Sequence, residues 1–311
     1  MAAITYAPAR IINIMTLTRL SLPAPAKINL LLHITGQRAD GYHLLQTLFQ
    51  FLDLHDELHF QLTNDGLITL QPQLKGVAEK DNLITRAAGL LAPLRKNQQQ
   101  GVAIDLEKNL PMGGGLGAGS SDAATTLLAL NQLWELGLDL DQLAALGLKL
   151  GADVPVFIFG QTAWAEGIGE QLQPAAAKEA VYLLIFPGCH CDTGKLFSHP
   201  DLPRNTPLIS PQAAQQHLGE NDFEALVRQL YPAVEATFAW LATEHQQGYL
   251  TGSGASVYCR LDNKQQAQAL LAKLPSHFAG FKPKAWVAQG CNQSLTHVKL
   301  IAHKGSLLNF A

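Results

Sequence analysis

Residues 111–124 read PMGGGLGAGSSDAA, a stretch with five glycines and two serines that leads directly into an apolar helical pattern. Glycines let a backbone close around a polyphosphate, and the unpaired N–H groups at the start of a helix attract negative charge. A flexible linker is the alternative, but Leu127, Leu130 and Trp134 follow at the spacing of one helical face. The stretch therefore predicts a phosphate-binding loop that opens a helix, with the two serines adding hydroxyl groups.

This loop differs from three familiar nucleotide loops. A Walker A loop requires a lysine after its last glycine, whereas Gly119 is followed by Ser-Ser-Asp. The glycine spacing does not fit a protein kinase, and the sequence has no His-Arg-Asp catalytic loop. A Rossmann loop is disfavoured because the stretch lies in the middle of the chain and no acidic residue closes a second strand about 20 residues later. The pattern indicates a nucleotide-phosphate loop of another kind.

The composition is that of an ordinary globular protein. The chain has 311 residues, of which 47% are hydrophobic and 15% charged, and this length favours two domains because single cores stop growing near ~250 to 300 residues. The net charge is −3 without a long run of Lys or Arg, so neither nucleic acid nor an anionic membrane is an expected partner. No apolar run approaches the ~20 residues of a membrane span, and the first residues do not follow the order of a signal peptide. We expect a cytoplasmic protein.

The cysteines are few and are not spaced as a disulfide framework, which agrees with a reducing compartment. Cys189, His190 and Cys191 are candidate zinc ligands. Adjacent residues of an extended chain point to opposite faces, however, and no second ligand pair lies at finger spacing. We therefore predict no metal-binding residues.

Periodicity and turn residues predict alternating strands and helices along the chain. An Asp-Gly turn at residues 63–66 predicts a hairpin between two short strands. Asp139 and Gln142 resemble a capping box, Gly137 is the expected C-cap of the helix before it, and Leu140 is expected on the buried face of the helix that follows. The predicted strands are residues 26–34, 47–54, 57–62, 67–70, 101–110, 156–159, 181–186, 256–260 and 284–289. The predicted helices are 82–92, 140–150, 223–230, 233–244 and 264–273, with a further helix between the glycine loop and Gly137.

Two charged residues suit phosphoryl transfer, which needs positioned cations and often a carboxylate that accepts the proton of the attacking hydroxyl. Lys27 lies in an apolar strand, where alternation places it on the same face as Asn29. Asp153 is expected in a loop between a helix and the strand 156–159. From the residues alone, a structural ion pair or a solvated carboxylate is the favoured interpretation, and a catalytic role is the alternative.

The order of four stretches resembles the GHMP kinases, named for galactose, homoserine, mevalonate and phosphomevalonate. The resemblance covers residues 22 to about 295. Within that family, the pairing of PAKINL with R-x-DGYH resembles kinases of the non-mevalonate isoprenoid pathway. The four stretches are PAKINLLLHITGQRADGYH (25–43), PMGGGLGAGSSDAA (111–124), LGADVPVF (150–157) and LTGSGASV (250–257).

The resemblance implies an α/β (α+β) fold with two domains and the active site between them. Residues 1–20 would form an N-terminal extension, residues 21–175 an ATP-binding domain like the second domain of ribosomal protein S5, and residues 176–311 a ferredoxin-like C-terminal domain. ATP would be held with Mg²⁺ bridging its phosphate oxygens. The residues implied to wrap the triphosphate are Pro111, Met112, Gly113, Gly114, Gly115, Leu116, Gly117, Ala118, Gly119, Ser120 and Ser121.

The resemblance also implies roles for single residues. Asp153 matches the general base that acts on the substrate's 2-hydroxyl, and Lys27 matches the lysine that holds this base and stabilises developing charge. The substrate-contacting matches are Asn29, then Tyr42 and His43 at a cytosine site, with Phe197 closing that site and Thr193 nearby; Gly252 and Gly254 match a late loop that approaches the phosphates.

Without the resemblance, several of these residues have ordinary explanations. Tyr42 and His43 would flank a turn, and Gly252 and Gly254 would form a tight turn before a strand. Ala118 departs from the family because glycine is common at its position, so its φ must be negative to avoid strain.

The implied activity is ATP-dependent phosphorylation of the 2-hydroxyl of a cytidine diphosphate-linked methylerythritol. The expected partner is thus a small-molecule alcohol, and a homodimer is compatible with the sequence. Two alternatives are a homoserine or mevalonate kinase, which the DGYH stretch disfavours, and a nucleotide-binding regulator without catalysis, which the presence of both Lys27 and Asp153 disfavours.

Overall fold

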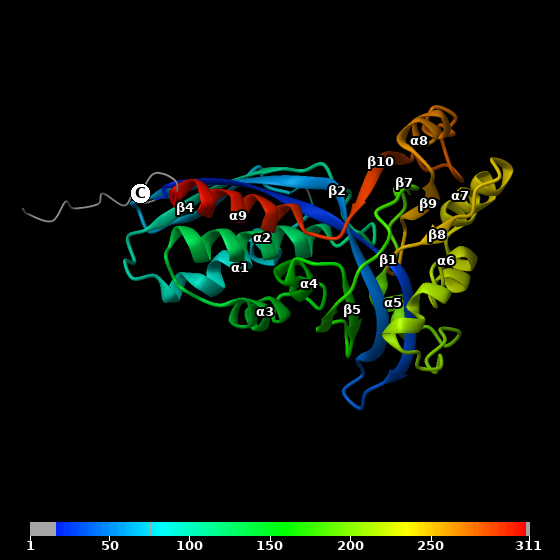
Figure 1. Ribbon diagram of the computed structural model, residues 1–311, viewed down its shortest axis with the longest axis horizontal. Coiled ribbons are helices and arrows are strands. Elements are labelled where there is room, and N and C mark those ends of the chain that lie inside the picture. Colours follow the sequence, from blue (N-terminus) through cyan, green and yellow to red (C-terminus); the bar gives the residue numbers. More distant parts are fainter. Residues whose placement is uncertain (1–16, 75, 309–311) are drawn as a thin grey trace, which may run out of the picture.

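The structure, a computed structural model, describes residues 17–74 and 76–308, and within them ten strands form one sheet (Figure 1). The strands are β1 (Arg19–Gln37), β2 (His43–Thr63), β3 (Ile68–Gln71), β4 (Gly101–Glu107), β5 (Ala163–Glu166), β6 (Gln171–Pro174), β7 (Val181–Phe186), β8 (Tyr249–Leu250), β9 (Val257–Leu261) and β10 (Lys284–Cys291). The α-helices are α1 (Leu83–Leu91), α2 (Ala118–Leu133), α3 (Leu140–Leu148), α4 (Val154–Phe159), α5 (Thr193–Ser198), α6 (Glu224–Leu230), α7 (Pro232–Thr243), α8 (Lys264–Leu271) and α9 (Leu295–Leu308). Short 3₁₀ helices occupy Glu79–Asp81, Ala92–Leu94 and Pro211–Gln216.

The long antiparallel hairpin of β1 and β2 is the central element of the fold. Its antiparallel register runs from Arg19 opposite Gln61 to Gln37 opposite His43, and in Figure 1 it runs from the left-hand side of the molecule to the tip at the bottom. Bulges shift the register between Pro25 and Lys27, between Asn29 and Leu31, and between Ile34 and Gly36. The predicted strands of this region are therefore parts of two longer ones.

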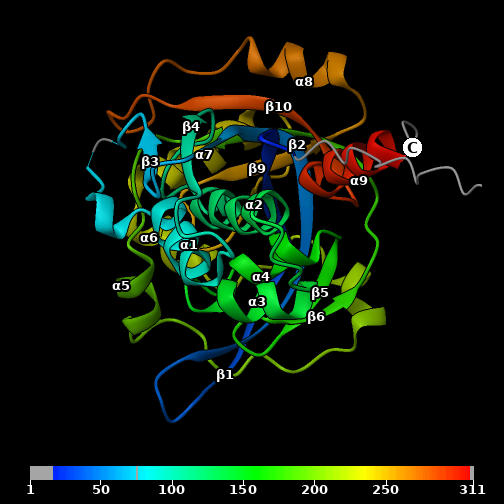
Figure 2. The same cartoon turned by 90° about the vertical axis from the view of Figure 1, so that its left-hand side faces the viewer.

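One half of the molecule packs helices against the sheet of β1, β2 and β4. Figure 2 shows α2 in the middle of this layer, with α1 and α4 beside it. Leu127, Leu130 and Trp134 are all buried here, which confirms the predicted helical face. The apolar face of α2 thus anchors the glycine loop that precedes it.

The other half packs α6, α7 and α8 around β7, β9 and β10 (Figure 1). The two halves share one sheet because Gly290 and Cys291 of β10 pair with Leu52 and Phe51 of β2. The chain then returns to the first half, where α9 packs on β1 and the hydroxyl of Thr296 donates to the carbonyl of Pro23 at 2.7 Å. No sequence signal predicted α9, and β5, β6, β8 and α5 were also missed.

The predicted hairpin at residues 63–66 is wrong. β3 pairs in parallel with β4, and β4 lies between β3 and β2. The seven residues of β4 alternate to bury Val102, Ile104 and Leu106, so β4 occupies the interior position and the four-residue β3 takes the edge. The Asp-Gly pair marks a turn, but it does not determine which strands pair with each other in the sheet.

The predicted strand 156–159 is also wrong, because these residues belong to helix α4. Pro155 lies in the first turn, where its missing N–H and fixed φ suit a helix, and Gly160 ends the helix in the left-handed conformation. The residues of α4 that are fully buried are Val154, Pro155, Val156, Phe157 and Ile158. Tertiary burial here overrides the β preference of the β-branched side chains.

Helix ends differ in smaller ways from the prediction. The capping box of Asp139 and Gln142 is confirmed, but α2 ends at Leu133, before Gly137. Leu140, expected to be buried, is 47% exposed because α3 turns mainly Leu143 toward the core. β1 begins at Arg19, slightly before the predicted start of the fold, and residues 1–16 lie outside the described residues.

Candidate active site

A cavity of about 590 Å³ lies against the β1–β2 hairpin. Its walls also come from the starts of α2 and α4, from α5 and from the loop after β8. The predicted residues that line it are Lys27, Asn29, Tyr42, His43, Ser120, Asp153, Thr193, Phe197 and Gly252. The fold thus brings together residues that are far apart in the chain. The rest of the predicted glycine loop, residues 111–119 and 121, lies outside this cavity, as does Gly254.

Lys27 and Asp153 meet at the cavity wall. The ammonium of Lys27 lies 3.4 Å from Oδ2 of Asp153 and donates to Oδ1 of Asn29 at 2.7 Å. It also lies 5.3 Å from the ring centroid of Phe49. The Lys27 side chain is 3% exposed and that of Asp153 is 38% exposed. The arrangement therefore holds a buried cation beside a carboxylate that a cavity ligand can reach.

Asn29 is held by a network that sequence reasoning did not predict. Its side-chain N–H donates to the hydroxyl of Thr47 at 2.8 Å, and that hydroxyl donates to the carbonyl of Leu31 at 2.6 Å. Its backbone N–H donates to the hydroxyl of Thr251 at 3.0 Å. These bonds turn the amide oxygen of Asn29 toward Lys27. Thr251 lies in a stretch that the sequence had singled out, whereas Thr47 carries no local signal.

The two glycine loops pack against each other. Gly115 has φ +76°, and a Cβ at this position would lie 2.4 Å from the carbonyl oxygen of Thr251 and 3.0 Å from that of Gly254. The N–H of Ser256 donates to the carbonyl of Gly114 at 3.2 Å. Glycine is thus required at residue 115 by both backbone conformation and space. The two loops, widely separated in sequence, form one structural unit.

The start of α2 fits an anionic group. Gly117 is its left-handed N-cap, and Ala118 begins the helix with a right-handed backbone, so the departure from glycine at this position causes no strain. Ser120 lines the cavity, while the hydroxyl of Ser121 is buried and has no hydrogen-bond partner among the described residues. Unpaired N–H groups and hydroxyls at a helix start can donate hydrogen bonds to phosphate oxygens. Hydroxyl oxygens can also bind a hard cation that the phosphates hold.

A buried triad behind the loop was missed from the sequence. The ammonium of Lys108 donates to Oδ2 of Asp56 at 2.6 Å and to Oδ2 of Asp122 at 2.7 Å. Burial acts to lower the pKa of Lys108, but the charges of Asp122 and Asp56 outweigh it and raise the pKa. Burial raises the pKa of Asp122 to about 7 against the opposing effect of Lys108. Asp56 also accepts hydrogen bonds from the backbone N–H groups of Asn109 and Leu110.

The far end of the cavity is aromatic. The rings of His43 and Phe197 stack with centroids 4.7 Å apart at 28°, and Phe197 meets Phe223 edge-on at 5.0 Å. Tyr42 is 59% exposed at the cavity. The hydroxyl of Thr193 lies 2.7 Å from that of Ser253, which connects α5 to the second glycine loop. Stacked rings beside an exposed tyrosine offer a flat surface of the kind that binds a heterocyclic base.

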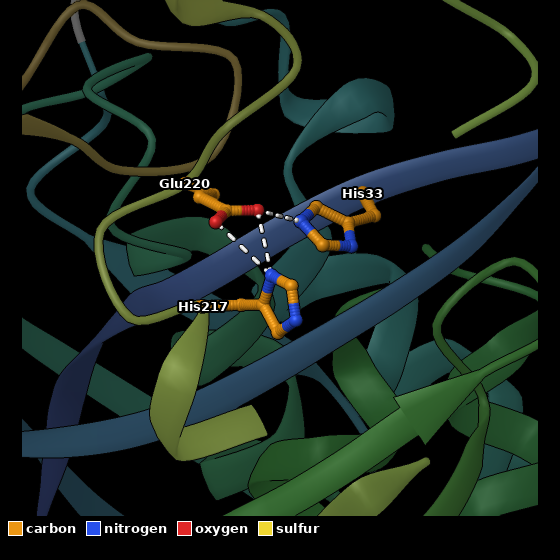
Figure 3. Close-up of side chains that lie close together, drawn as sticks. All are labelled: His33, His217 and Glu220. Atoms are coloured by element: carbon orange, nitrogen blue, oxygen red, sulfur yellow. Dashed lines mark hydrogen bonds and ion pairs between the residues drawn. The ribbon is translucent and has the colours of Figure 1, made fainter. Parts of the chain in front are cut away.

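Among the described residues, His33, His217 and Glu220 form the cluster of metal-ligating side chains (Figure 3). Nε2 of His33 lies 2.8 Å from Glu220, and Nδ1 of His217 lies 3.0 and 3.1 Å from its two oxygens. Burial acts to raise the pKa of Glu220, but hydrogen bonds from His217 and His33 lower it. Nδ1 of His33 is buried without a partner, whereas a metal-bound histidine normally donates from its second nitrogen. The cluster therefore fits a hydrogen-bonded clasp between β1 and the loop before α6.

Comparisons with known proteins agree with this geometry. The sequence pattern described as GHMP kinases N terminal domain matches residues 82–161, and that described as GHMP kinases C terminal matches residues 206–280. A 4-diphosphocytidyl-2-C-methyl-D-erythritol kinase from Chromohalobacter salexigens is 51% identical, covering 92% of this chain and 95% of the relative. One from Nitrosococcus oceani is also 51% identical, covering 88% and 95%.

Solved structures extend the likeness. A crystal structure of 4-(cytidine 5'-diphospho)-2C-methyl-D-erythritol kinase superposes with TM-score 0.72 at 33% identity, covering 88% of this chain and 100% of the other. A homoserine kinase from Cytophaga hutchinsonii superposes with TM-score 0.59 at 15% identity, covering 93% of this chain and 98% of the other, and shares the fold alone.

The chain belongs to the GHMP kinases, enzymes that use ATP, which confirms the predicted fold class of a two-domain α/β kinase. Within them it belongs to the 4-diphosphocytidyl-2-C-methyl-D-erythritol kinase family. No helix in the part of the chain that the structure describes is long and apolar enough to cross a membrane.

Proposed function

We propose that this protein transfers the γ-phosphoryl group of ATP to the 2-hydroxyl of 4-diphosphocytidyl-2-C-methyl-D-erythritol, giving the 2-phosphate and ADP in the non-mevalonate isoprenoid pathway. The observation that carries the proposal is the contact between Lys27 and Asp153 at 3.4 Å on the wall of a cavity whose other end is aromatic. Membership of the kinase family supports the choice of substrate.

Asp153 is the proposed general base. The oxygen of the substrate's 2-hydroxyl forms a bond to the γ-phosphorus, the bond from that phosphorus to the ADP oxygen breaks, and the hydroxyl proton passes to the Asp153 carboxylate. This hydroxyl is tertiary and weakly acidic, so it must be aimed and deprotonated as the phosphorus is transferred. A positioned base contributes about 10² to 10⁴-fold to the rate.

Lys27 is the proposed partner of this base. The ammonium of Lys27 contacts both Asn29 and Asp153, and this holds the Asp153 carboxylate in place. Its positive charge also lies beside the proposed reacting group, where negative charge develops during the transfer. Because the network of Thr47 and Thr251 holds Asn29, the pair is oriented before any ligand binds. Asn29 itself lines the cavity and is a proposed contact of the substrate.

The proposed ATP site is the loop from Pro111 to Ser121. The cavity-lining Ser120 would face phosphate oxygens or Mg²⁺, and the hydroxyl of Ser121, buried without a partner among the described residues, lies next to it in the chain. Mg²⁺ supplies neutralisation of the phosphate charge when it is bound. Gly252 and Gly254 bring the second loop against the first, which keeps the phosphate side closely packed.

The proposed cytidine site is the aromatic end of the cavity. Tyr42 offers an exposed ring, and His43 and Phe197 offer a stacked pair. Thr193 lies between this end and the second glycine loop through its contact with Ser253. The aromatic residues and the Lys27–Asp153 pair line the same cavity, which suits a substrate that carries a base at one end and the reacting alcohol at the other.

Purified protein with ATP, Mg²⁺ and each of three alcohols tests the proposal. We expect turnover with 4-diphosphocytidyl-2-C-methyl-D-erythritol and a ³¹P signal of a phosphomonoester on the 2-position, without turnover of homoserine or mevalonate. Turnover with homoserine or mevalonate alone would refute the substrate assignment. ATP binding without turnover of any of them would favour a nucleotide-binding regulator.

Several expectations beyond the reaction stay predictions. These are the absence of a nucleic-acid partner, a homodimer, a cytoplasmic location, and the division into domains at residues 175 and 176. We propose the division because the two matched family regions lie on either side of it.

A further inference from the structure

Arg204 joins the two stacked rings at the aromatic end of the cavity. Its Nε donates to Nε2 of His43 at 3.1 Å, and its Nη2 donates to the carbonyl of Phe197 at 2.8 Å. The same guanidinium donates to the carbonyls of His199 and Leu202 at 2.8 and 2.9 Å. All of these acceptors except His43 belong to the segment from the end of α5 to Arg204, so the arginine fixes that segment against the first residue of β2.

The contact with His43 determines where the imidazole carries its hydrogen. A guanidinium has five N–H donors and no acceptor, so Nε2 of His43 must accept with its lone pair. In a neutral ring the hydrogen is then on Nδ1. Burial lowers the pKa of His43, and the charge of Arg204 lowers it further, so both effects favour the neutral ring. His43 is therefore a donor through Nδ1.

We infer that Arg204 is the positioning residue of base recognition: it holds His43 as an Nδ1–H donor and holds Phe197 stacked on it. The inference rests on the proposed function, because it assigns this end of the cavity to a pyrimidine. A donor at Nδ1 suits the ring nitrogen N3 of cytosine, which is an acceptor. Uracil carries a hydrogen on N3 and would set donor against donor. Arg204 thereby contributes to the choice of cytidine over uridine ligands.

Other titratable groups near His43 do not replace Arg204 in this role. Asp40 and Asp153 line the same cavity, but Arg204 is the charged group that shifts the pKa of His43. Among the residues that the structure describes, the hydrogen bonds of the arginine go to His43 and to backbone carbonyls, and none goes to a carboxylate. The guanidinium charge therefore lies beside the histidine without a neutralising carboxylate among its hydrogen-bond partners in the described part of the chain.

The first test is the tautomer of His43 in the full chain. In protein with ¹⁵N-labelled histidine, the His43 signals are assigned by comparison with His43→Gln. We expect the hydrogen on Nδ1 and a pKa below the ordinary value of about 6.5. In Arg204→Met, which removes every donor at similar length, we expect the pKa to rise toward that value and the hydrogen to redistribute to Nε2.

The second test is binding of CMP and UMP by calorimetry. Wild type should prefer CMP, and Arg204→Met should lose roughly 3- to 10-fold of that preference, the range of one hydrogen bond. The KM for the cytidine substrate should rise by a similar factor with kcat nearly unchanged. Arg228→Met is the matched control, because Arg228 also makes several hydrogen bonds, to Glu235 and Glu224, but none at the cavity.

A wild-type spectrum with the hydrogen on Nε2 of His43 would overturn the inference, as would an Arg204→Met protein with unchanged tautomer and unchanged CMP preference. Where Arg204→Met does not fold, Arg204→Lys, which keeps the charge and a single donor nitrogen, should show a smaller loss of preference in the same direction. Absence of turnover with the cytidine substrate in wild type would refute the proposed function. The His43 spectrum tests the role of Arg204 independently of that result.

Discussion

The ammonium of Lys27 lies 3.4 Å from the carboxylate of Asp153, and the lysine is buried while the aspartate is half-exposed. Lys27 comes from strand β1, and Asp153 is the N-cap of helix α4. A buried cation held by fixed oxygen atoms requires no reorganisation when charge develops nearby. This geometry supports the role in phosphoryl transfer that we propose for the pair.

Asp153→Asn should abolish most of the activity without unfolding the protein. The amide keeps the shape but cannot accept the hydroxyl proton, so kcat should fall by about 10² to 10⁴-fold. Steady-state kinetics and a thermal melt measure both effects. Asp141→Asn, an exposed acid on α3, is the control and should match wild type. An Asp153→Asn protein as fast as wild type would exclude Asp153 as the base.

Lys27 and Asp153 should act as one unit. Lys27→Met removes the cation and should lower kcat strongly, and the double variant with Asp153→Asn should be little slower than the worse single variant. The comparison of kcat/KM for all four proteins gives the interaction free energy between the two residues. If the losses of the two single variants simply add, the contact has no role in the chemistry.

Gly115→Ala should disrupt the packing of the two glycine loops. The methyl group would lie 2.4 Å from a backbone carbonyl of Thr251, at a residue with φ +76°. We expect a clear loss of stability together with a raised KM for ATP. Gly137→Ala is the control, since its φ is also positive, at +72°, with open space around it. That variant should lose only the roughly 1–2 kcal/mol of backbone strain and keep its KM.

Asp122 should make stability depend on pH in a particular direction. Its pKa in the folded state is raised to about 7, above the ~3.9 of an unfolded aspartate. Between these values the folded state binds the extra proton. The contribution of Asp122 to the free energy of unfolding is therefore fully present at low pH and is lost as pH rises through about 7. Lys108, whose pKa is raised from a value near 10.5, does not titrate in this window.

Asp122→Asn removes this titration and provides the test. Urea unfolding of both proteins between pH 4 and 8 should show wild type losing stability relative to the variant as pH rises, by up to roughly 1.4 kcal/mol per pH unit. Asp141→Asn should give a difference that does not change with pH. A flat or opposite trend for Asp122→Asn would mean that Asp122 stays charged in the fold.

Much of the fold and the candidate site followed from short stretches of sequence. The glycine loop and the buried face of α2 were predicted because helix starts and helical faces have local signatures. Alternation along β1 predicted that Lys27 and Asn29 project together, and their hydrogen bond agrees. The resemblance to the GHMP kinases pointed to the residues that line the cavity.

What remained hidden has no local signature. The place of β3 beside β4 and the helical form of residues 154–159 depend on what packs around them. The triad of Lys108, Asp56 and Asp122 joins three separate segments of the chain, and the local sequence of none of them indicates the other two.

The sequence by itself determined that a glycine-rich loop opens helix α2 and that a lysine and an aspartate stand on either side of it in the chain. The resemblance to the GHMP kinases implied that Lys27 holds Asp153, and the tertiary structure brings the two side chains to 3.4 Å. Only the tertiary structure decided that Arg204 reaches His43. The physical reason is that backbone preference acts over a few residues, whereas these contacts arise when burial of distant apolar faces brings separate segments together.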